Sequence, residues 1–515
     1  MKLRKIISLI LITLLTAAFF GGCQKKEKVQ ESEAINLTYW MPLDAATALT
    51  VSNFGETPFA KELTKRTGVT VDYIHPAKNN ASEEFNILLA SNNLPDIIEY
   101  RWMGYLGGAG KAVEDGFIVP LNDIIEKKAP NLYGFLKLNP EIDKAVRTNG
   151  GNYIGFPAIA GDPSLTVAAG LVIRKDWLDD VGLEVPETIE EWEKVLTAFR
   201  DEKNSPAPLS FVYSDFEYGV FVGAYGIGNG IYLDNGTVKF GPLEPGYKEF
   251  LVKMNDWYKK GLLDKNLFSI DSQTASSNVT SGVCGASVGA IGGGIGKWMK
   301  NAPEGFDLVA APYPVLEKGQ VPQFGHKTSQ VYSQSAAITK DCRDIDAAMK
   351  LLDYGYSEEG RMLFNFGIEG ESYTMVDGYP TYTDIITNDK SGRSMQAMLA
   401  RYTRAANGAM GSIQDKRYME QYARLPQQKN AWEVWSNTNA GVHVLPTMYP
   451  LEEDTEEYSK IVLSIDTYNR DMITKFIMGV VPLSEYDEYV AQLKARGIDR
   501  LIRIHQDAYQ RYLER

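Results

Sequence analysis

The segment from residue 36 to residue 100 alternates strand-like and helix-like parts, and this alternation limits the possible folds more than any other feature of the chain. Apolar residues recur at two-residue spacing in some parts and at helical spacing in the parts between them. A β-α-β-α-β order implies parallel strands in one sheet, with the helices covering the sheet. The sequence therefore predicts an α/β fold. The strand-like parts are 37–40, 69–74 and 96–100, and the helical parts are 59–67, which Gly68 ends, and 82–90.

A second group of strand-like and helix-like segments begins after Gly150 and continues into a mostly helical C-terminal third. Thr188 and Glu191 have capping-box spacing, which predicts a helix that runs to about Glu202. Another helix is predicted over 247–260, where apolar residues lie at helical spacing. The chain has 515 residues, too many for one compact core, so we expect two or more large lobes. Strands are expected at 152–157, 171–173 and 283–291, and C-terminal helices at 345–364, 432–436, 458–478 and 485–513.

The N-terminus has the order of a secretory signal. Lys2, Arg4 and Lys5 precede an uncharged apolar run over 6–20, which leads to Gly21-Gly22-Cys23 and then to charged residues. The apolar run is too short for a membrane-spanning helix, which needs about 20 apolar residues. Residues 24–35 are polar and charged, so we expect a flexible tether over 23–35.

The Gly21-Gly22-Cys23 sequence resembles the lipobox of bacterial lipoproteins, although Phe20 stands where that motif usually has Leu or another aliphatic residue. In such proteins the Cys thiol receives a diacylglycerol and becomes the new N-terminus. The resemblance implies a lipoprotein signal peptide over 1–22, lipidation with palmitate-type acyl chains at Cys23, and a location on the extracellular face of the cell membrane. The alternative is an ordinary secreted protein with a Cys near the cleavage site.

The charge balance argues against nucleic acid and against an anionic membrane surface as the main partner. The chain has 53 Lys and Arg against 66 Asp and Glu, for a formal net charge of −13, whereas both of those partners attract basic patches. If Cys23 is lipidated, Cys284 and Cys342 remain. The two could form one bridge, but we expect two buried thiols, and no disulfide framework is predicted.

Two glycine-containing motifs suggest catalysis, and neither is specific. Residues 285–289 (GASVG) match the G-x-S-x-G nucleophile elbow, which would make Ser287 the nucleophile of a secreted serine hydrolase. The competing interpretation is a small-residue strand that allows close approach to its backbone. Residues 292–297 (GGGIGK) lack the Gly and the Ser or Thr of a phosphate-binding loop, since Ile291 and Trp298 occupy those positions. No catalytic residue, cofactor or metal is predicted.

Six stretches spread over the mature chain resemble extracellular solute-binding proteins of ABC importers, family 1, and in particular their large lipoprotein branch in Gram-positive bacteria. They are 91–96 (SNNLPD), 174–183 (RKDWLDDVGL), 254–264 (MNDWYKKGLLD), 366–373 (FGIEGESY), 465–468 (IDTY) and 475–479 (KFIMG).

The resemblance implies a two-lobed, periplasmic-binding-protein-like clamp of type II with a helical C-terminal third. Lobe 1 would span about 36–150 plus a later segment, and lobe 2 about 165–335 plus the C-terminal helices, joined by crossing segments. A monomeric, non-catalytic receptor would capture a carbohydrate, in this family mostly an oligosaccharide, between the lobes and deliver it to ABC permease subunits. A peptide-binding receptor of the same fold is the alternative within this family.

One departure from the family concerns calcium. Many relatives carry an Asp/Asn/Gly-rich calcium loop after the helix that here ends near Asp201. This chain has DEKNSPAP at 201–208, without alternating oxygen ligands or a closing acidic residue. We therefore predict no structural calcium there.

Ligand-binding residues are expected just beyond the carboxyl ends of strands and near the crossing segments. Aromatic rings suit a sugar ligand because they stack on the apolar faces of sugar rings. By contrast, Trp177, Trp192 and Trp257 lie at helical spacing among apolar neighbours and are expected in the core. The predicted ligand-binding residues are Trp40, Tyr100, Arg101, Trp102, Tyr153, Trp298, Glu371 and Tyr373.

Overall fold

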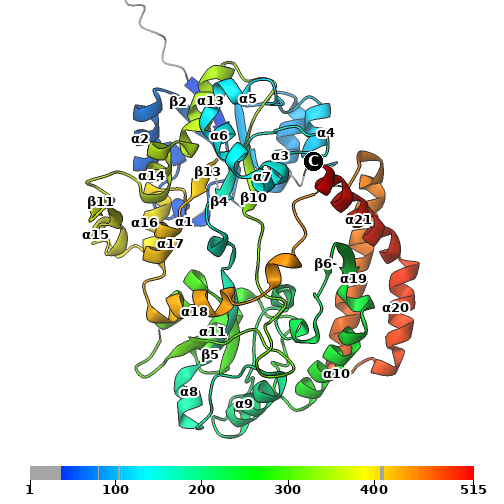
Figure 1. The fold of residues 1–515 in the computed structure, drawn as a ribbon. Helices are drawn as coiled ribbons and strands as arrows, with labels where there is room; N and C mark the ends of the chain where they lie inside the picture. The colour runs from blue at the N-terminus through cyan, green and yellow to red at the C-terminus, as the bar shows by residue number, and fades with distance from the viewer. Residues whose placement is uncertain are drawn as a thin grey trace, which may run out of the picture. The chain divides into compact units, whose positions relative to one another are not determined.

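The computed structural model describes residues 36–515, other than 79, 103, 104, 106, 301, 406–410 and 449. The predicted signal peptide over 1–22, the lipidation of Cys23 and the tether over 23–35 lie outside the described residues. Residues 35–515 form one compact unit (Figure 1). In the part of the chain that is described, no helix combines the length and the apolar character needed to cross a membrane.

Lobe 1 is built on a mixed six-stranded sheet in the order β13-β4-β10-β3-β1-β2. Strand β1 (Asn36–Trp40) pairs in parallel with both β2 (Thr70–Ile74) and β3 (Ile97–Tyr100), as the sequence predicts. Helix α2 (Pro58–Thr67) ends at Gly68, whose φ of 71° places it in the left-handed region, and α3 (Ala81–Ser91) leads to β3. The α/β fold and the parallel β-α-β-α-β unit are thus confirmed.

A buried carboxylate, that of Asp96, joins this unit to a segment far along the chain. Its side chain accepts hydrogen bonds from the backbone N–H and the hydroxyl of Thr38 in β1, both at 2.7 Å. It also accepts from Arg343, which follows β10 (Val331–Ile338), through the backbone N–H at 2.7 Å and the guanidinium Nη2 at 2.5 Å. Burial by itself would raise the pKa of Asp96, but these hydrogen bonds hold it well below its usual range.

The other half of the sheet comes from later segments. Strand β10 runs antiparallel to β3 and to β4 (Phe156–Ala160), and β4 pairs in parallel with β13 (Ser412–Gln414). Strand β4 therefore begins later than the predicted 152–157. Tyr153 instead forms an isolated antiparallel bridge with Arg147, so the chain before β4 folds back locally on lobe 1.

Two predicted helices are each split in two. The predicted 345–364 helix consists of α13 (Ile345–Asp353) and α14 (Glu358–Phe366), because Ser357 adopts an extended backbone and caps α14. The predicted 485–513 helix consists of α20 (Tyr486–Ala495) and α21 (Ile498–Glu514), because Gly497 has φ of 95°. An extended N-cap serine or a left-handed glycine separates two helices even where the apolar spacing continues.

Lobe 2 is built on the three-stranded sheet β8-β5-β9, in which both outer strands are antiparallel to β5 (Ala169–Arg174). The capping box of Thr188 and Glu191 opens α9 (Ile189–Asp201), as predicted, and α10 (Pro245–Lys259) packs against α19 (Thr455–Met478). The lobe 2 core contains the predicted core tryptophans Trp177, Trp192 and Trp257.

The remaining strands and helices are short. They are α1 (Ala45–Ala48), α4 (Gly108–Glu114), α5 (Ile125–Lys128), α6 (Pro130–Leu138), α7 (Pro140–Ala145), α8 (Lys175–Asp180), β6 (Ile231–Asp234), β7 (Thr237–Phe240), α11 (Ser272–Thr280), β8 (Ala286–Ala290), α12 (Lys297–Lys300), β9 (Leu308–Ala310), β11 (Tyr373–Val376), β12 (Tyr379–Tyr382), α15 (Asp384–Thr387), α16 (Met395–Tyr402), α17 (Lys416–Tyr422) and α18 (Pro426–Ser436).

Three segments cross between the two sheets (Figure 1). The first crossing segment, 161–168, joins β4 to β5; the second, 311–330, joins β9 to β10; and the third, 415–425, leads from β13 through α17 to α18. Helix α18 then packs on β9 in lobe 2. Both Cys284, which is buried, and Cys342, which is half-buried, are free thiols.

Trp435 fixes α18 on lobe 2. Its ring is fully buried, its indole Nε1 donates to the carbonyl oxygen of Leu171 at 3.1 Å, and Gly170 in β5 leaves room for it. A Cβ at position 170 would lie 2.6 Å from the indole.

We expect Trp435→Ala to lower the free energy of unfolding by about 3–5 kcal/mol, because it removes a large core ring and leaves a cavity. Chemical denaturation measures this loss. Trp432→Ala, three residues earlier in the same helix and half-buried, is the matched control and should cost clearly less. Equal losses in the two variants would contradict this assignment of Trp435 to the core.

Candidate functional site

At the carboxyl end of β3, the structure separates the predicted ligand-binding residues into buried and accessible ones. Trp102 is fully buried, and its indole donates to the carbonyl oxygen of Ile98 at 3.2 Å. Trp40 is also buried, with its ring centroid 5.7 Å from that of Tyr100. Tyr100 is half-buried and Arg101 is exposed. Two of these four side chains, Tyr100 and Arg101, therefore have surface that a ligand can touch.

Tyr153 belongs to a polar cluster within lobe 1. Its hydroxyl donates to Asp143 at 2.6 Å and accepts from Arg147 at 2.6 Å. The Arg147 guanidinium also lies 4.6 Å from the centre of the Tyr153 ring. These contacts attach α7 to the turn before β4. Tyr153 therefore lies apart from the crossing segments.

Trp298 fills space that glycines leave in lobe 2. The ring is buried, and its indole donates to the Ser276 hydroxyl at 2.6 Å. A Cβ at Gly289 would come within 2.6 Å of this ring. Gly294, in the wide turn Ile291–Gly296, packs directly on Gly289. The sequence predicts that these glycines let a ligand approach the backbone. In the structure they instead make room for the Trp298 indole.

Glu371 and Tyr373 support the β11–β12 hairpin. The Glu371 carboxylate accepts from the Tyr402 hydroxyl at 2.8 Å, and its backbone carbonyl accepts from Thr383 at 2.6 Å. Tyr373 is buried, and its ring centroid lies 5.9 Å from that of Phe366. Both residues therefore hold this part of lobe 1 together.

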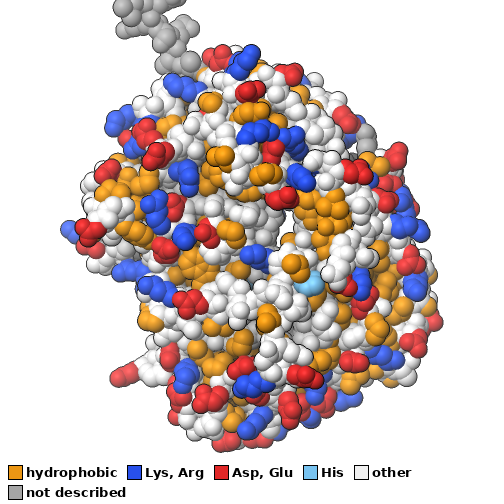
Figure 2. Space-filling model, viewed as in Figure 1, with side chains coloured by type: hydrophobic (Ala, Val, Ile, Leu, Met, Phe, Trp, Pro, Cys, Tyr) orange, Lys and Arg blue, Asp and Glu red, His pale blue; other side chains and the backbone are white. Residues whose placement is uncertain are grey.

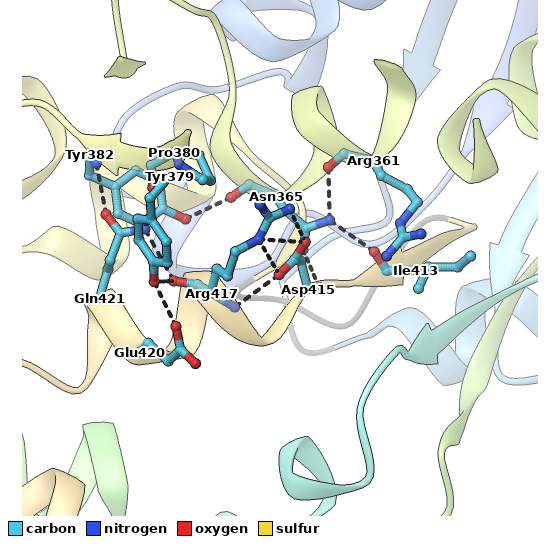
Figure 3. A network of polar contacts seen from close by, with 10 residues as sticks. All are labelled: Arg361, Asn365, Tyr379, Pro380, Tyr382, Ile413, Asp415, Arg417, Glu420 and Gln421. Atoms are coloured by element: carbon cyan, nitrogen blue, oxygen red, sulfur yellow. Dashed lines mark hydrogen bonds and ion pairs between the residues drawn. The ribbon is translucent and has the colours of Figure 1, made fainter. Parts of the chain in front are cut away.

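A polar network positions the third crossing segment (Figure 3). Asn365 in α14 donates to the carbonyl oxygen of Ile413 at 2.9 Å and accepts from the backbone N–H of Asp415 at 2.8 Å. Asp415 accepts from the backbone N–H of Arg417 at 2.9 Å and pairs with its guanidinium at 2.6 Å. The carboxyl end of β13 and the start of α17 are thus fixed to α14.

The same network attaches the hairpin to α17. The Tyr379 hydroxyl donates to the Glu420 carboxylate at 2.6 Å. The Gln421 side chain donates to the carbonyl oxygen of Pro380 at 2.7 Å and accepts from the backbone N–H of Tyr382 at 2.8 Å. Figure 3 shows these side chains converging from the hairpin and from α17. Helix α17 therefore presents its remaining side chains in a defined orientation.

Aromatic and polar side chains from the first and third crossing segments, from the start of β10 and from α18 gather where the chain passes between the lobes. We call this group the interlobe site. Each member keeps accessible surface, with Lys416 exposed and the other five half-buried. The interlobe site consists of Asp162, Ser164, Tyr332, Lys416, Tyr422 and Trp432.

Hydrogen bonds orient two of the aromatic members of the interlobe site, and packing positions the third. Trp432 in α18 donates its indole N–H to the carbonyl oxygen of Ser164 at 2.8 Å, and the Tyr332 hydroxyl donates to Gln414 at 2.9 Å. Tyr422 packs on Gly292 of lobe 2, where a Cβ would lie 2.3 Å from the ring. Each ring is thereby fixed at one edge while part of it stays accessible.

The charged members of the interlobe site are also paired. Asp162 accepts from the hydroxyl and the backbone N–H of Ser164, at 2.6 and 2.9 Å, and its carboxylate lies 3.7 Å from the Lys416 ammonium. The Ser164 hydrogen bonds, followed by the charge of Lys416, lower the pKa of Asp162. Burial raises the pKa of Tyr332 and of Tyr422. Flat aromatic surfaces beside an ionised carboxylate and an ammonium suit a polar ligand with apolar faces.

None of the six members of the interlobe site is among the residues that the sequence predicts to bind the ligand. Trp432 falls at the start of a predicted helix, and its three-residue spacing from Trp435 makes the two look like one core face. Asp162, Lys416 and Tyr422 stand outside any predicted strand or helix. The one feature that these residues share is that each lies close to a segment where the chain passes from one lobe to the other.

Ser287 has no features of a nucleophile. It lies inside β8 and not on a strand-to-helix turn, it is buried, and its hydroxyl donates to the carbonyl oxygen of Val288 at 3.4 Å. A Cβ at Gly285, the first glycine of the motif, would lie 2.3 Å from Phe199. The G-x-S-x-G pattern therefore reflects close packing around a buried strand.

The loop after α9 does not fit a calcium ion. The Asp201 carboxylate accepts from Arg200 at 2.6 and 2.8 Å, and Lys203 donates to Asp180 at 2.6 Å. Within the described residues, no group of three or more His, Cys, Asp or Glu side chains could hold a metal ion. Calcium requires 6–8 oxygen ligands, and the carboxylate here is already paired with a cation.

Comparison with known proteins agrees with this architecture. The family model described as bacterial extracellular solute-binding protein matches residues 53–362. A fructooligosaccharide ABC transporter substrate-binding protein of Streptococcus pneumoniae is 24% identical over 504 residues, covering 91% of this chain and 90% of that protein. Lipoprotein LipO of Bacillus subtilis is 23% identical, covering 96% of this chain and 97% of that protein.

Solved structures share the fold over nearly the whole described chain. A crystal structure of an alginate-binding protein without calcium ion has a TM-score of 0.73 at 24% identity, covering 93% of this chain and 98% of that one. An HMO-binding solute-binding protein from Bifidobacterium longum infantis has a TM-score of 0.76 at 19% identity, with coverages of 93% and 99%. The chain is a two-lobed solute-binding protein without enzymatic activity, and it belongs to the bacterial extracellular solute-binding protein family.

Proposed function

We propose that this protein captures an oligosaccharide at the interlobe site and delivers it to the permease of an ABC importer. The observation that carries the proposal is the set of half-buried rings of Tyr332, Tyr422 and Trp432 on or beside the crossing segments. The names of two relatives support a carbohydrate: one binds fructooligosaccharide, and another, 24% identical, is a polygalacturonan/rhamnogalacturonan-binding protein of Bacillus subtilis.

The ligand would act by joining the lobes. Trp432 belongs to a helix packed on lobe 2, whereas Asp162 and Lys416 follow strands of the lobe 1 sheet. A ligand that touches both groups stabilises the closed arrangement by the contacts it makes only there. Tyr100 and Arg101 are retained as lobe 1 contacts, because they keep accessible surface at the end of β3. The other predicted residues are left out, since five are buried rings and the Glu371 carboxylate is bonded to Tyr402.

The ligand-binding prediction concerns Trp432. We expect Trp432→Ala to weaken oligosaccharide binding by about two- to tenfold from the loss of stacking alone, because one stacking ring contributes roughly 0.5–1.5 kcal/mol beyond the area it buries. Isothermal titration calorimetry against a panel of fructo- and galacturono-oligosaccharides measures the loss. Trp432→Phe keeps an aromatic face and should lose less.

A peptide panel in the same calorimeter separates the alternative receptor. Binding of peptides with no response to any oligosaccharide would replace the carbohydrate proposal by a peptide-binding one. Unchanged oligosaccharide affinity in Trp432→Ala would remove the interlobe site from the proposal.

We also propose that Cys23 carries a lipid that holds the receptor at the extracellular face of the membrane, beside its permease. The support is the order of the N-terminal sequence and the name of the lipoprotein relative. A single acyl chain gives marginal binding, so stable anchoring requires the diacyl form.

Cys23→Ala should therefore move the protein from the membrane fraction of the cells to the medium, without loss of ligand affinity. Immunoblots of the two fractions measure the distribution, and Cys284→Ala is the control that should stay with the membrane. Retention of Cys23→Ala on the cell surface would contradict the lipid anchor.

We further propose that folding does not depend on calcium. Millimolar calcium or a chelator should leave the melting temperature unchanged, and Asp201→Ala should behave like the parent protein, because the Asp201 carboxylate pairs with Arg200. Differential scanning calorimetry tests this. A calcium-dependent rise in melting temperature that Asp201→Ala abolishes would show that the loop binds the ion.

A further inference from the structure

A cavity of about 190 Å³ lies among the crossing segments, next to the interlobe site. Pro163 and Thr166 of the first crossing segment line one part, and Lys327 to Gln330 of the second line another. The rest is formed by Gly441, Val444, Leu445 and Pro446, between α18 and α19. We call this cavity the hinge pocket. It has room for roughly six water molecules, close to the bulk of one sugar ring.

Lys327 is the charged residue among those that line the hinge pocket. It is half-buried, and its ammonium donates to the neutral carbonyl oxygen of Pro163 at 3.0 Å. Among the described residues, no carboxylate lies within ion-pair distance of it. Burial lowers the pKa of Lys327, and the nearby charge of Asp162 opposes this only in part. A partly desolvated cation without a close counter-ion favours a ligand that brings a negative charge.

The other lining groups suit hydroxyls and an apolar ring face. Thr166 donates its hydroxyl proton to the carbonyl oxygen of Pro163 at 2.6 Å, and Thr328 donates to that of Thr166 at 3.3 Å. Their oxygens keep lone pairs that can accept hydrogen bonds from sugar hydroxyls. Val444, Leu445 and Pro446 supply an apolar wall. Together these groups match a saccharide better than a small inorganic anion.

Selectivity for an anionic ligand would have to be local. The protein has a formal net charge of −13, and Figure 2 shows acidic and basic side chains interspersed over the face it draws, which is hollowed near its middle. The electrostatic field of the whole molecule therefore does not attract an anion. The ammonium of Lys327 lies within the pocket itself and can attract an anion there.

From this arrangement we propose that the hinge pocket binds the carboxylate-bearing unit of an acidic oligosaccharide, such as a uronate, with Lys327 pairing with the carboxylate. The inference rests on the proposed oligosaccharide function and adds a ligand class to it. The pocket adjoins the interlobe site through residues 162–164, so one ligand can reach both. Because its lining comes from separate crossing segments, an occupant also holds those segments in one relative arrangement.

The test compares trigalacturonate with its carboxyl-reduced, neutral counterpart by titration calorimetry. The parent protein should bind the acid at least about tenfold more tightly, because a hydrogen bond between two charged groups is stronger than one between neutral groups. Lys327→Met should abolish this preference while keeping affinity for the neutral sugar, and Lys327→Arg should retain most of it. Lys318→Met is the matched control, because Lys318 lies on the same crossing segment and pairs with Glu187 and Glu191 outside the pocket.

A second measurement needs no variant. Affinity for trigalacturonate should fall as salt rises from 50 to about 500 mM, whereas affinity for the neutral sugar should not, because salt screens only the charged contact. Equal affinities for acid and neutral sugar, or a preference that survives Lys327→Met, would overturn the hinge-pocket proposal and leave the oligosaccharide function standing. Competition by millimolar phosphate as effective as that by trigalacturonate would reassign the pocket to a free anion. If no oligosaccharide binds, the proposed function itself fails.

Discussion

The buried carboxylate of Asp96 is the interaction on which lobe 1 depends. It satisfies the backbone and hydroxyl donors of Thr38 and holds the backbone and guanidinium of Arg343, which stands 247 positions further along the chain. The parallel unit of β1 to β3 is thereby joined to β10, the strand that returns from lobe 2. The second crossing segment enters lobe 1 at β10, whose pairing with β3 and β4 is thus supplemented by a side-chain attachment just beyond the strand. Burial of an ionised group on this scale is stable only because hydrogen-bond donors surround it.

Glycines in lobe 2 leave space that side chains of the third crossing segment and α18 fill. In the wide turn over 291–296, Gly292 admits the ring of Tyr422, and Gly296 admits the amide of Gln428, which donates to the carbonyl oxygen of Ile291 at 2.8 Å. The third crossing segment and α18 can therefore approach the end of β8 closely. Side chains from one segment fill positions that another leaves empty, and this interlocking fixes the surroundings of the interlobe site.

Local sequence patterns predicted the regular elements well and the site poorly. The capping box at Thr188, the left-handed Gly68 and the alternation of β1, β2 and β3 all depend on neighbours in the sequence, and each is confirmed. The split at Ser357 was missed because the apolar spacing continues across it. The interlobe site depends on contacts between distant segments, such as that of Trp432 with Ser164, which no local pattern encodes. Whether an aromatic ring is core or accessible is decided by the same long-range packing, as Trp102 and Trp432 illustrate.

The burial of the tryptophans has a spectroscopic consequence. The chain has eight, all within the described residues; seven are buried, and Trp432 is the one that is half-buried. The emission of a buried indole changes little when solvent composition changes, whereas an indole at a solvated boundary responds to whatever replaces the water beside it. Quenching by iodide or acrylamide should therefore act mainly on a single ring. The protein carries an intrinsic optical probe at the boundary between its lobes, without a label or an engineered residue.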